Sequence, residues 1–241
     1  MVVLDNINVT FKRGTITTVI GKSGVGKSVL LKHIIGLIEP DSGDILYSGR
    51  TIASMTELEK ITLSSKFSYM FQHMALFDSM TIFENIALPL QENKKFPNSD
   101  IEMRVMEKMH QLELNDIGYK YPSQISGGMQ KRVALARALI TDPEIILFDE
   151  PTTGLDPIRK NAVFNLIADN QKQFGYTAII VSHAIPDIFY ISDQIAMLDN
   201  ARILYHGSPE IIYQCQKQEV QEFIRGTEAL KNKRHAMAVG M

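Results

Sequence analysis

The sequence has one cysteine, no tryptophan and almost no net charge. A lone thiol, Cys215, cannot form an intramolecular disulfide or a cysteine-rich zinc site; this suits a reducing compartment, so we expect a cytoplasmic location. The chain has 25 Lys and Arg against 27 Asp and Glu, a formal net charge of −2. This balance does not favour a basic nucleic-acid-binding surface, and we expect no nucleic-acid partner.

Long apolar runs are also missing. The purely apolar segments 145–148 and 178–181 have four residues each, whereas a helix that crosses a bilayer needs roughly 20. The start of the sequence, residues 1–5, has no basic segment followed by an apolar stretch, which a secretory signal needs. From the sequence we therefore expect a chain that neither spans a membrane nor is exported.

What the sequence does contain is an alternation of strand and helix patterns. The 241 residues are 45% apolar and 22% charged, which is enough for one sizeable core. Short β-branched runs predict buried strands at 15–20, 67–71, 145–148 and 178–181. Further strands are predicted at 7–11, 44–47, 194–198 and 202–205, the last two as a hairpin across Asp199 and Asn200. The predicted fold class is α/β, a central sheet with an antiparallel β flank.

Between residues 72 and 140 the strand pattern gives way to three helical stretches. They are predicted at 81–88, 99–112 and 128–140. We therefore expect a single domain over 1–241, with an α/β core from 1–72 and 141–208 and an inserted helical subdomain at 73–140. A C-terminal helical tail is expected at 209–241, where Ser208 as N-cap and Pro209 start a helix that runs to Gly226, before a frayed end at 231–241.

A phosphate-loop motif, G-x-x-x-x-G-K-[ST], lies between strand 15–20 and a helix pattern. Its residues are Gly21, Lys22, Ser23, Gly24, Val25, Gly26, Lys27 and Ser28. The glycines let the backbone wind so that its N–H groups and the helix N-terminus converge on phosphate oxygens. We expect Lys27 to pair the β- and γ-phosphates of a nucleotide and Ser28 to bind Mg²⁺.

Two adjacent carboxylates, Asp149 and Glu150, follow the apolar strand 145–148, and Pro151 ends that strand. Asp149 is expected to hold Mg²⁺ through its water shell, and Glu150, on the alternate face, to polarise an attacking water. Alone, the pair is explained equally well as a solvated turn. The phosphate loop in the same chain favours the functional interpretation.

A second glycine-rich helix start is formed by Ser126, Gly127 and Gly128. Ser126 is placed as an N-cap, and the glycines leave backbone N–H groups bare. In isolation this tripeptide is most simply a turn and a helix cap.

Taken in order, these motifs resemble the ATP-binding subunits of ABC transporters over nearly the whole chain. The set is completed by Gln72 after a strand, the Gly-Leu-Asp segment 154–156 and His183 after another strand. The resemblance implies a P-loop NTPase (RecA-like) core that binds ATP and Mg²⁺. It also implies that Gln72 senses Mg²⁺ and the membrane subunit, that Asp156 makes a contact across a dimer, and that His183 is a γ-phosphate switch. By itself, a histidine after a strand is more often a core or cap residue.

The same resemblance implies a mechanism. Two copies associate head to tail, so that ATP at Lys27 of one copy is closed by Ser126 and Gly128 of the other. Physically, the helix start at Gly127 supplies positive dipole to a γ-phosphate that one chain leaves half solvated. We therefore expect hydrolysis to need a dimer, and loss of the γ-phosphate to part the two copies and move a partner.

Two departures from the usual family pattern indicate a branch. Met129 stands where a glutamine usually follows Ser-Gly-Gly, and Gln72 is followed by the segment 73–90. Both features, with segments 203–209 and 222–226, resemble the ATPase of Mce-type phospholipid transport systems. That resemblance implies a transmembrane permease, an Mce-domain lipid-binding protein and a small regulatory subunit as partners, and a peripheral position on the inner face of the inner membrane. The ATPase of a polar-solute importer or a cell-division complex, and a nucleotide-gated clamp with little turnover, stay open as alternatives.

The start of the sequence and one apolar set each need a separate interpretation. Family members usually carry an extra strand and an aromatic residue that stacks on adenine, both upstream of residues 3–6. This sequence begins there, so we expect weakened adenine recognition. Phe11 alternates with Ile7 and Val9 and is expected in the core. The apolar set, which fits either simple packing or a groove for a permease helix, is Met74, Phe77, Met80 and Phe83.

Overall fold

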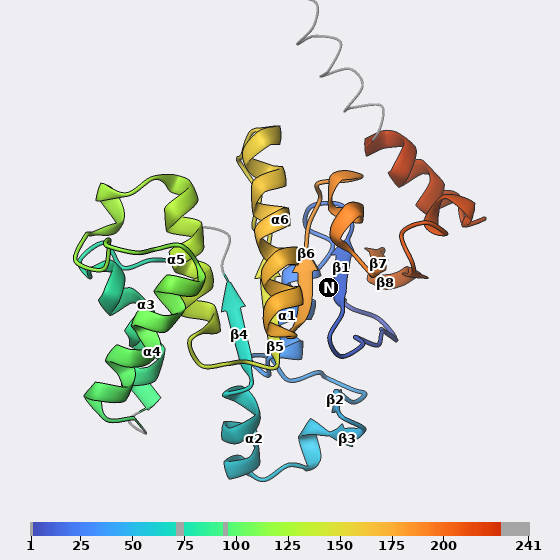
Figure 1. The fold of residues 1–241 in the computed structure, drawn as a ribbon. Helices are drawn as coiled ribbons and strands as arrows, with labels where there is room; N and C mark the ends of the chain where they lie inside the picture. Colours follow the sequence, from blue (N-terminus) through green and yellow to red (C-terminus); the bar gives the residue numbers. More distant parts are fainter. Residues whose placement is uncertain (1, 71–74, 94–95, 228–241) are drawn as a thin grey trace, which may run out of the picture.

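The computed structural model describes residues 2–70, 75–93 and 96–227. Within them, the main sheet has six strands in the order β4-β5-β6-β1-β7-β8 (Figure 1). The strands are β4 (Phe67–Met70), β5 (Ile145–Asp149), β6 (Thr177–Val181), β1 (Ile16–Ile20), β7 (Gln194–Asp199) and β8 (Arg202–Gly207). Strands β4 to β7 in this order are parallel, and β8 is antiparallel to β7. The predicted central sheet and the hairpin of its last two strands are confirmed. The antiparallel flank is smaller than predicted, because β7 is parallel to β1 and only β8 of the main sheet is antiparallel to its neighbour.

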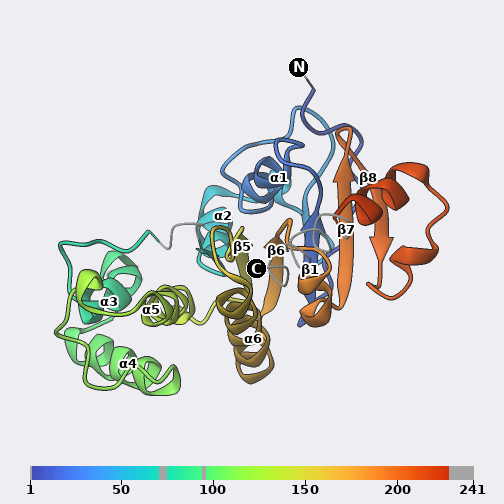
Figure 2. The same cartoon turned by 90° about the horizontal axis from the view of Figure 1, so that it is seen from above.

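Helices cover both faces of this sheet, with α1 (Lys27–Ile34) on one side and α6 (Pro157–Phe174) on the other (Figure 2). Alternate residues of β5 point to opposite faces. Leu147 therefore packs in the same cluster as Leu30 of α1, whereas Ile146 packs in the cluster that contains the α6 side chains. Because both faces are covered, the central strands are apolar almost throughout, which explains their short unbroken runs in the sequence.

Three helices stand together beside β4, at one side of the sheet (Figures 1 and 2). They are α3 (Ile82–Asn93), α4 (Asn98–Gln111) and α5 (Gly127–Leu139), in the region where helices were predicted. α3 starts at a capping box, in which the Glu84 carboxylate accepts from the Thr81 N–H and the Thr81 hydroxyl accepts from the Glu84 N–H. The side chains that these helices bury against one another include Ile86, Leu90, Val105, Met109 and Leu135.

A smaller unit lies next to the main sheet. β2 (Leu46–Tyr47) and β3 (Arg50–Thr51) form a two-stranded sheet, followed by α2 (Glu57–Ser64), a helix that the sequence patterns did not predict. The strand expected at 44–47 is therefore shorter than predicted. Short 3₁₀ helices occur at Ile52–Ser54, Pro122–Gln124, Asp187–Ile191 and Ile212–Gln214.

The strand predicted at 7–11 is wrong, although its alternation is present. Ile7, Val9 and Phe11 are half-buried and pack against the α1 side of the core, which confirms the expected core position of Phe11. The segment forms no ladder with a neighbouring strand. A strand needs an adjacent backbone for its hydrogen bonds, and alternation of side chains does not supply one.

The C-terminal helix begins later than predicted. The Tyr205 hydroxyl donates to the Ser208 carbonyl (2.6 Å), a 3₁₀ turn follows at Ile212–Gln214, and within the described residues the helix starts at 218 and includes 218–227. Ile212 is fully buried, so insertion of this side chain into the core overrides the local helix-start signal at Ser208. The end expected to be frayed, 231–241, lies outside the described residues.

Candidate functional site

The phosphate loop joins the carboxyl end of β1 to the start of α1, at the edge of the sheet where the parallel strands end. Gly24 and Gly26 have φ angles of 80° and 104°, which L side chains rarely adopt. A Cβ on Gly21 would collide with the carbonyl oxygen of Leu198 in β7. Gly26 is the N-cap of α1 and has no side chain to bond the first N–H groups, and the first turn carries no acidic residue, so this helix start is open to an anion.

Lys27 is buried, with only 7% of its surface exposed. Its Nζ donates to the carbonyl oxygens of Gly21 and Lys22, each 2.9 Å away. Burial lowers the pKa of Lys27, and the negative charges of Glu150 and Asp149 oppose this shift. The ammonium therefore lies at the centre of the loop, where it can exchange carbonyl partners for phosphate oxygens. The outer loop residues are Lys22, Ser23 and Gly24, which are exposed, and Val25, which is half-buried.

Ser28 and Asp149 are distant in the sequence but adjacent in the structure. The Ser28 hydroxyl donates to Asp149 Oδ1 (3.1 Å), and the Tyr69 hydroxyl donates to Asp149 Oδ2 (2.8 Å). Burial, followed by the bond to Asp149, raises the pKa of Tyr69, so its hydroxyl keeps its proton. A serine hydroxyl beside a carboxylate is a set of hard oxygen donors, which fits Mg²⁺ held by one carboxylate and phosphates better than an all-protein metal cage. Among the described residues, no group of three or more His, Cys, Asp or Glu has metal-binding geometry.

Glu150 has different partners from Asp149. Its carboxylate lies 2.7 Å from His183 Nδ1 and accepts a hydrogen bond from the Thr153 hydroxyl (3.1 Å). The Glu150 backbone has a positive φ of 51°, and its N–H donates to Val181 of β6. The hydrogen bond with Glu150 is the main cause that raises the pKa of His183, whereas burial and, to a smaller extent, the charges of Lys27 and Lys160 oppose the shift. The structure thus brings together Lys27, Ser28, Asp149, Glu150 and His183 at one edge of the sheet.

Ser126, Gly127 and Gly128 lie elsewhere in the same chain. The Ser126 hydroxyl caps α5 by accepting from the Met129 N–H (3.3 Å), as the motif predicts. All three residues are exposed, and a Cβ on Gly127 would meet nothing within 4 Å. In both views α5 and α1 lie apart, with strands of the sheet between them (Figures 1 and 2). Within one protomer, the start of α5 is therefore not part of the phosphate-loop site.

A family model described as ABC transporter matches residues 4–153, which include the phosphate loop, the α5 start and both carboxylates. The chain belongs to the family of ABC transporter ATPase domains. It is 38% identical over 224 residues to MlaF of Escherichia coli K12, named an intermembrane phospholipid transport system ATP-binding protein, and the match covers 93% of this chain and 83% of MlaF.

Solved ABC ATPase structures have the same fold as this domain. CbiO1 from Clostridium perfringens, part of the ABC transporter complex cbiONQ, matches with a TM-score of 0.81 and 27% identity, over 95% of this chain and 92% of that one. The ATP-binding cassette MJ0796, a dimer in a post-hydrolysis state bound to ADP and Pi, matches with a TM-score of 0.72 and 29% identity. The match covers 86% of this chain and 90% of that one. The P-loop NTPase core expected from the sequence is confirmed.

Another predicted residue of this ABC ATPase domain, Asp156, makes a contact within its own helix. Asp156 is exposed and caps α6: its Oδ1 accepts from the Arg159 N–H (3.0 Å), and this bond is the main cause that lowers its pKa. Within one protomer Asp156 therefore acts as a helix cap, and a role in a dimer stays a prediction. Gln72 lies outside the described residues.

Two residues near the site were missed by sequence reasoning. Tyr69 reaches Asp149 from the neighbouring strand β4, and Lys131 of α5 is buried and donates to the Pro151 carbonyl (3.2 Å), just after Glu150. A tyrosine in an apolar strand is normally a core residue, so Tyr69 carried no signal. Lys131 had a weak sequence signal, because it precedes the buried segment 133–136 on a helix and a buried lysine there needs a partner.

A groove lies between β4, α3 and α5. Its lining includes Tyr69, Phe77, Leu88, Pro89, Ala134 and Arg137. Phe77 is 49% exposed, and the turn that carries it is held by the buried Asn85, whose side chain bonds the Phe77 N–H and carbonyl. Phe83 packs against the core instead, Met80 is half-buried, and Met74 lies outside the described residues. The predicted apolar set is thus divided between packing and surface.

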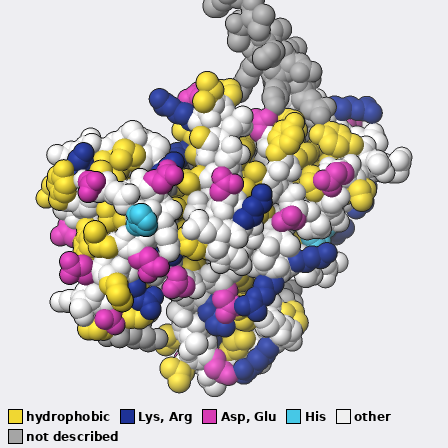
Figure 3. Space-filling view, in the orientation of Figure 1, with side chains coloured by type: hydrophobic (Ala, Val, Ile, Leu, Met, Phe, Trp, Pro, Cys, Tyr) yellow, Lys and Arg dark blue, Asp and Glu magenta, His cyan; other side chains and the backbone are white. Residues whose placement is uncertain are grey.

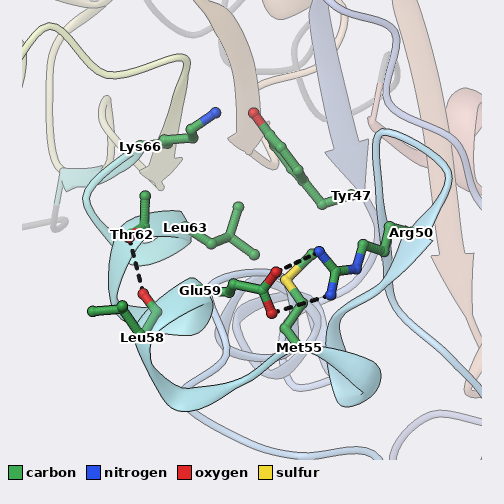
Figure 4. A pocket seen from close by; sticks show the side chains of 8 residues that line it. All are labelled: Tyr47, Arg50, Met55, Leu58, Glu59, Thr62, Leu63 and Lys66. Atoms are coloured by element: carbon green, nitrogen blue, oxygen red, sulfur yellow. Dashed lines mark hydrogen bonds and ion pairs between the residues drawn. The ribbon is translucent and has the colours of Figure 1, made fainter.

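A second pocket, formed by β2, β3 and α2, is not part of the phosphate site (Figure 4). It is lined by Tyr47, Arg50, Met55, Leu58, Glu59, Thr62, Leu63 and Lys66. Its cations are already paired, because Arg50 bonds both oxygens of Glu59 and Lys66 Nζ lies 2.7 Å from Glu144.

On the face shown in Figure 3, basic side chains lie among acidic ones and form no continuous stripe. Within the described ranges, none of the helices combines the length and hydropathy needed to cross a bilayer.

Proposed function

We propose that this chain hydrolyses ATP as a head-to-tail dimer and thereby drives phospholipid transport through a separate membrane permease. One observation carries the proposal: Lys27, Asp149 and Glu150 meet at one edge of the sheet, whereas the bare start of α5 lies away from them. A second copy that supplies its α5 start completes the set of phosphate-binding groups. Similarity to MlaF supports the phospholipid as cargo.

In this proposal the loop and Lys27 bind the β- and γ-phosphates. The backbone N–H groups at the start of α1 and the buried ammonium both favour negative charge. Ser28 and Gln72, with Asp149 acting through the water shell, would hold Mg²⁺, which would supply charge neutralisation at the phosphate oxygens. The oxygen donors Ser28 and Asp149 are already adjacent, which supports this assignment.

Glu150 acts on the attacking water. Its carboxylate is only 15% exposed and is held by His183 and Thr153, so it has a fixed orientation in a partly desolvated position. A carboxylate so placed accepts a proton from water that approaches the γ-phosphate. His183 is 60% exposed and can turn from Glu150 towards the γ-phosphate, as the switch role requires.

The dimer closes the site from outside. The partner subunit contributes its α5 N-terminus, with Ser126, Gly127 and Gly128, to the γ-phosphate, and Asp156 makes a contact across the interface. A Cβ at Gly127 would meet nothing in its own protomer. We therefore attribute the glycine to the close approach of the nucleotide that is bound by the other copy. Loss of the γ-phosphate removes the bridging charge and lets the two copies part.

The groove beside Phe77 is proposed as the docking site of the permease. It lies between the α/β sheet and the three helices, so a helix seated there would move with the separation of the two copies. The protein would then be peripheral on the inner face of the inner membrane. An Mce-domain lipid-binding protein and a small regulatory subunit complete the proposed assembly.

The proposal is tested with the complex that co-purifies from detergent-solubilised membranes, reconstituted in proteoliposomes. We expect a permease and an Mce-domain protein in the complex, ATP-dependent movement of labelled phospholipid, and hydrolysis that phospholipid stimulates. Glu150→Gln, which keeps size and hydrogen bonding, should reduce turnover by roughly 10²–10³-fold while ATP still binds.

Each alternative gives a different result. Stimulation by a polar solute, or co-purification with a cell-division complex, would assign the ATPase to another system. ATP-dependent closure with negligible turnover in the unmodified protein would indicate a clamp. Turnover by a strictly monomeric protein would contradict the head-to-tail site.

A further inference from the structure

The Asp149 carboxylate is held by two hydroxyl groups from different parts of the fold. Ser28 donates to Oδ1 (3.1 Å) and Tyr69 donates to Oδ2 (2.8 Å). We propose that Tyr69 is a positioning residue, which orients the Asp149 carboxylate towards the Mg²⁺ that accompanies the nucleotide. This inference rests on the proposed MgATP site and adds a residue that none of the sequence motifs contains.

The strand register explains how Tyr69 reaches the carboxylate. In the parallel pair β4–β5, Tyr69 lies opposite Leu147, and Asp149 is two residues further along β5. Residues two apart on a strand point to the same face. That face packs against α1, whose first turn carries Ser28, so both hydroxyl groups meet the carboxylate on the α1 side of the sheet.

Tyr69 is itself held in place. Its ring is half-buried and packs against the cluster that contains Leu147 and Leu30. A tyrosine side chain has only two torsions before its hydroxyl, and packing on the core restricts both of them. The donor therefore points at Oδ2 from a rigid support, which is what accurate orientation of a metal-binding group requires.

The contribution of Tyr69 becomes decisive when Mg²⁺ is bound. The terminal torsion of an aspartate has a broad energy profile, so a carboxylate with one weak partner can rotate. When the Ser28 oxygen binds the metal, its hydroxyl keeps its proton, but the direction of that hydroxyl is set by the metal as well as by Asp149. Among the described contacts of Asp149, the Tyr69 bond is the one whose direction does not depend on the metal. Removing such outer partners of metal ligands typically weakens metal binding about 10- to 100-fold.

The chain offers a matched control at the other end of the same strand. Tyr47 donates to Glu144 Oε2 (2.6 Å), and Glu144 immediately precedes β5. Tyr47 lines the pocket of Figure 4, and no phosphate-loop residue is among the residues that line it. Tyr47→Phe and Tyr69→Phe each remove one phenol hydroxyl that donates to a carboxylate, but only Tyr69→Phe does so at the proposed metal site.

The test measures metal and nucleotide binding separately in the full-length protein. Mn²⁺, as a paramagnetic probe for Mg²⁺, is titrated into the protein–ADP complex, and free Mn²⁺ is followed by electron paramagnetic resonance. ADP binding is measured in parallel in EDTA by fluorescence. We expect Tyr69→Phe to weaken Mn²⁺ binding by about tenfold or more, with ADP binding in EDTA and the melting temperature unchanged. Tyr47→Phe should leave the Mn²⁺ affinity at the value of the unmodified protein.

Two results would overturn the inference. One is an unchanged Mn²⁺ affinity in Tyr69→Phe; the other is an equal loss of ADP affinity in EDTA, which would show a structural role. If the unmodified protein binds neither ADP nor Mn²⁺, the proposed function itself fails, and the two failures are thus distinguishable.

Discussion

The two glycine-rich helix starts of this chain differ in how their own protomer surrounds them. At α1, a Cβ on Gly21 would collide with Leu198, and Lys27 is buried. At α5, Gly127 and Gly128 are exposed, and a Cβ on Gly127 would touch nothing. Glycine at Gly21 is therefore required by the fold of one protomer, whereas glycine at α5 is not. The difference teaches that one chain can contain two glycine-rich helix starts of which only one is shaped by its own protomer, as expected if the proposed dimer joins them into one phosphate site.

The largest expected effect is at the buried half. Lys27→Ala removes the ammonium at the centre of the loop and should lower ATP turnover by about 10²–10³-fold, because a fixed donor to the phosphates is lost. Steady-state phosphate release measures this. Lys60→Ala is the control, since Lys60 lies on α2 and pairs with Glu57, and its turnover should equal that of the unmodified protein. Retained ATP turnover in Lys27→Ala would show that hydrolysis does not need the buried ammonium at the α1 start.

The exposed half is tested by bulk and charge at Ser126. Ser126→Arg places a long side chain over the α5 start and should weaken the ATP-bound dimer by roughly 3 kcal/mol, about a hundredfold in dissociation constant. ATP binding to the monomer should persist, because the first site lies elsewhere in the chain. Sedimentation with ATP in a Glu150→Gln background measures dimerisation. An equal dimer fraction with and without Ser126→Arg would show that α5 does not face the partner.

A pair of glycine substitutions sharpens the contrast in stability. Gly21→Ala should destabilise the protomer by about 1–3 kcal/mol, because its Cβ meets a backbone oxygen that cannot move freely. Gly127→Ala should leave stability unchanged or raise it by about 0.5–1 kcal/mol, because alanine is the better helix former. Urea unfolding of the nucleotide-free protein decides between them, and equal losses would contradict the difference.

The smallest expected effect concerns pH. The bond with Glu150 raises the pKa of His183 above 6.5, so its contribution to stability is complete below pH 6.5 and is lost as the pH rises through the raised value. Because His183 is 60% exposed, the contribution should be roughly 0.5 kcal/mol or less. Urea unfolding should show that the free energy of unfolding falls less between pH 6 and pH 8 in His183→Gln than in the unmodified protein. Identical losses would mean that the pair does not form.

The parts of the fold and site that could be predicted have local or periodic signatures. The phosphate loop is a contiguous motif, and the hairpin β7–β8 is marked by Asn200, which has a positive φ of 46°. Ser28 and Asp149 were each assigned to Mg²⁺ from their own motifs, and the structure places their side chains in contact. The contact of Tyr69 with Asp149 could not be predicted, because it depends on the register between β4 and β5. The pairing of Glu150 with His183 likewise depends on the turn after each strand.

The sequence by itself determined the α/β class, the phosphate loop and the capped start of α5, because glycine φ angles, caps and apolar periodicity act over a few residues. The tertiary structure alone decided that segment 7–11 has no ladder, that Ile212 delays the last helix, and that Tyr69 holds Asp149. Each of these depends on a backbone or a cavity contributed by a distant segment, and such neighbours exist only once the core has assembled.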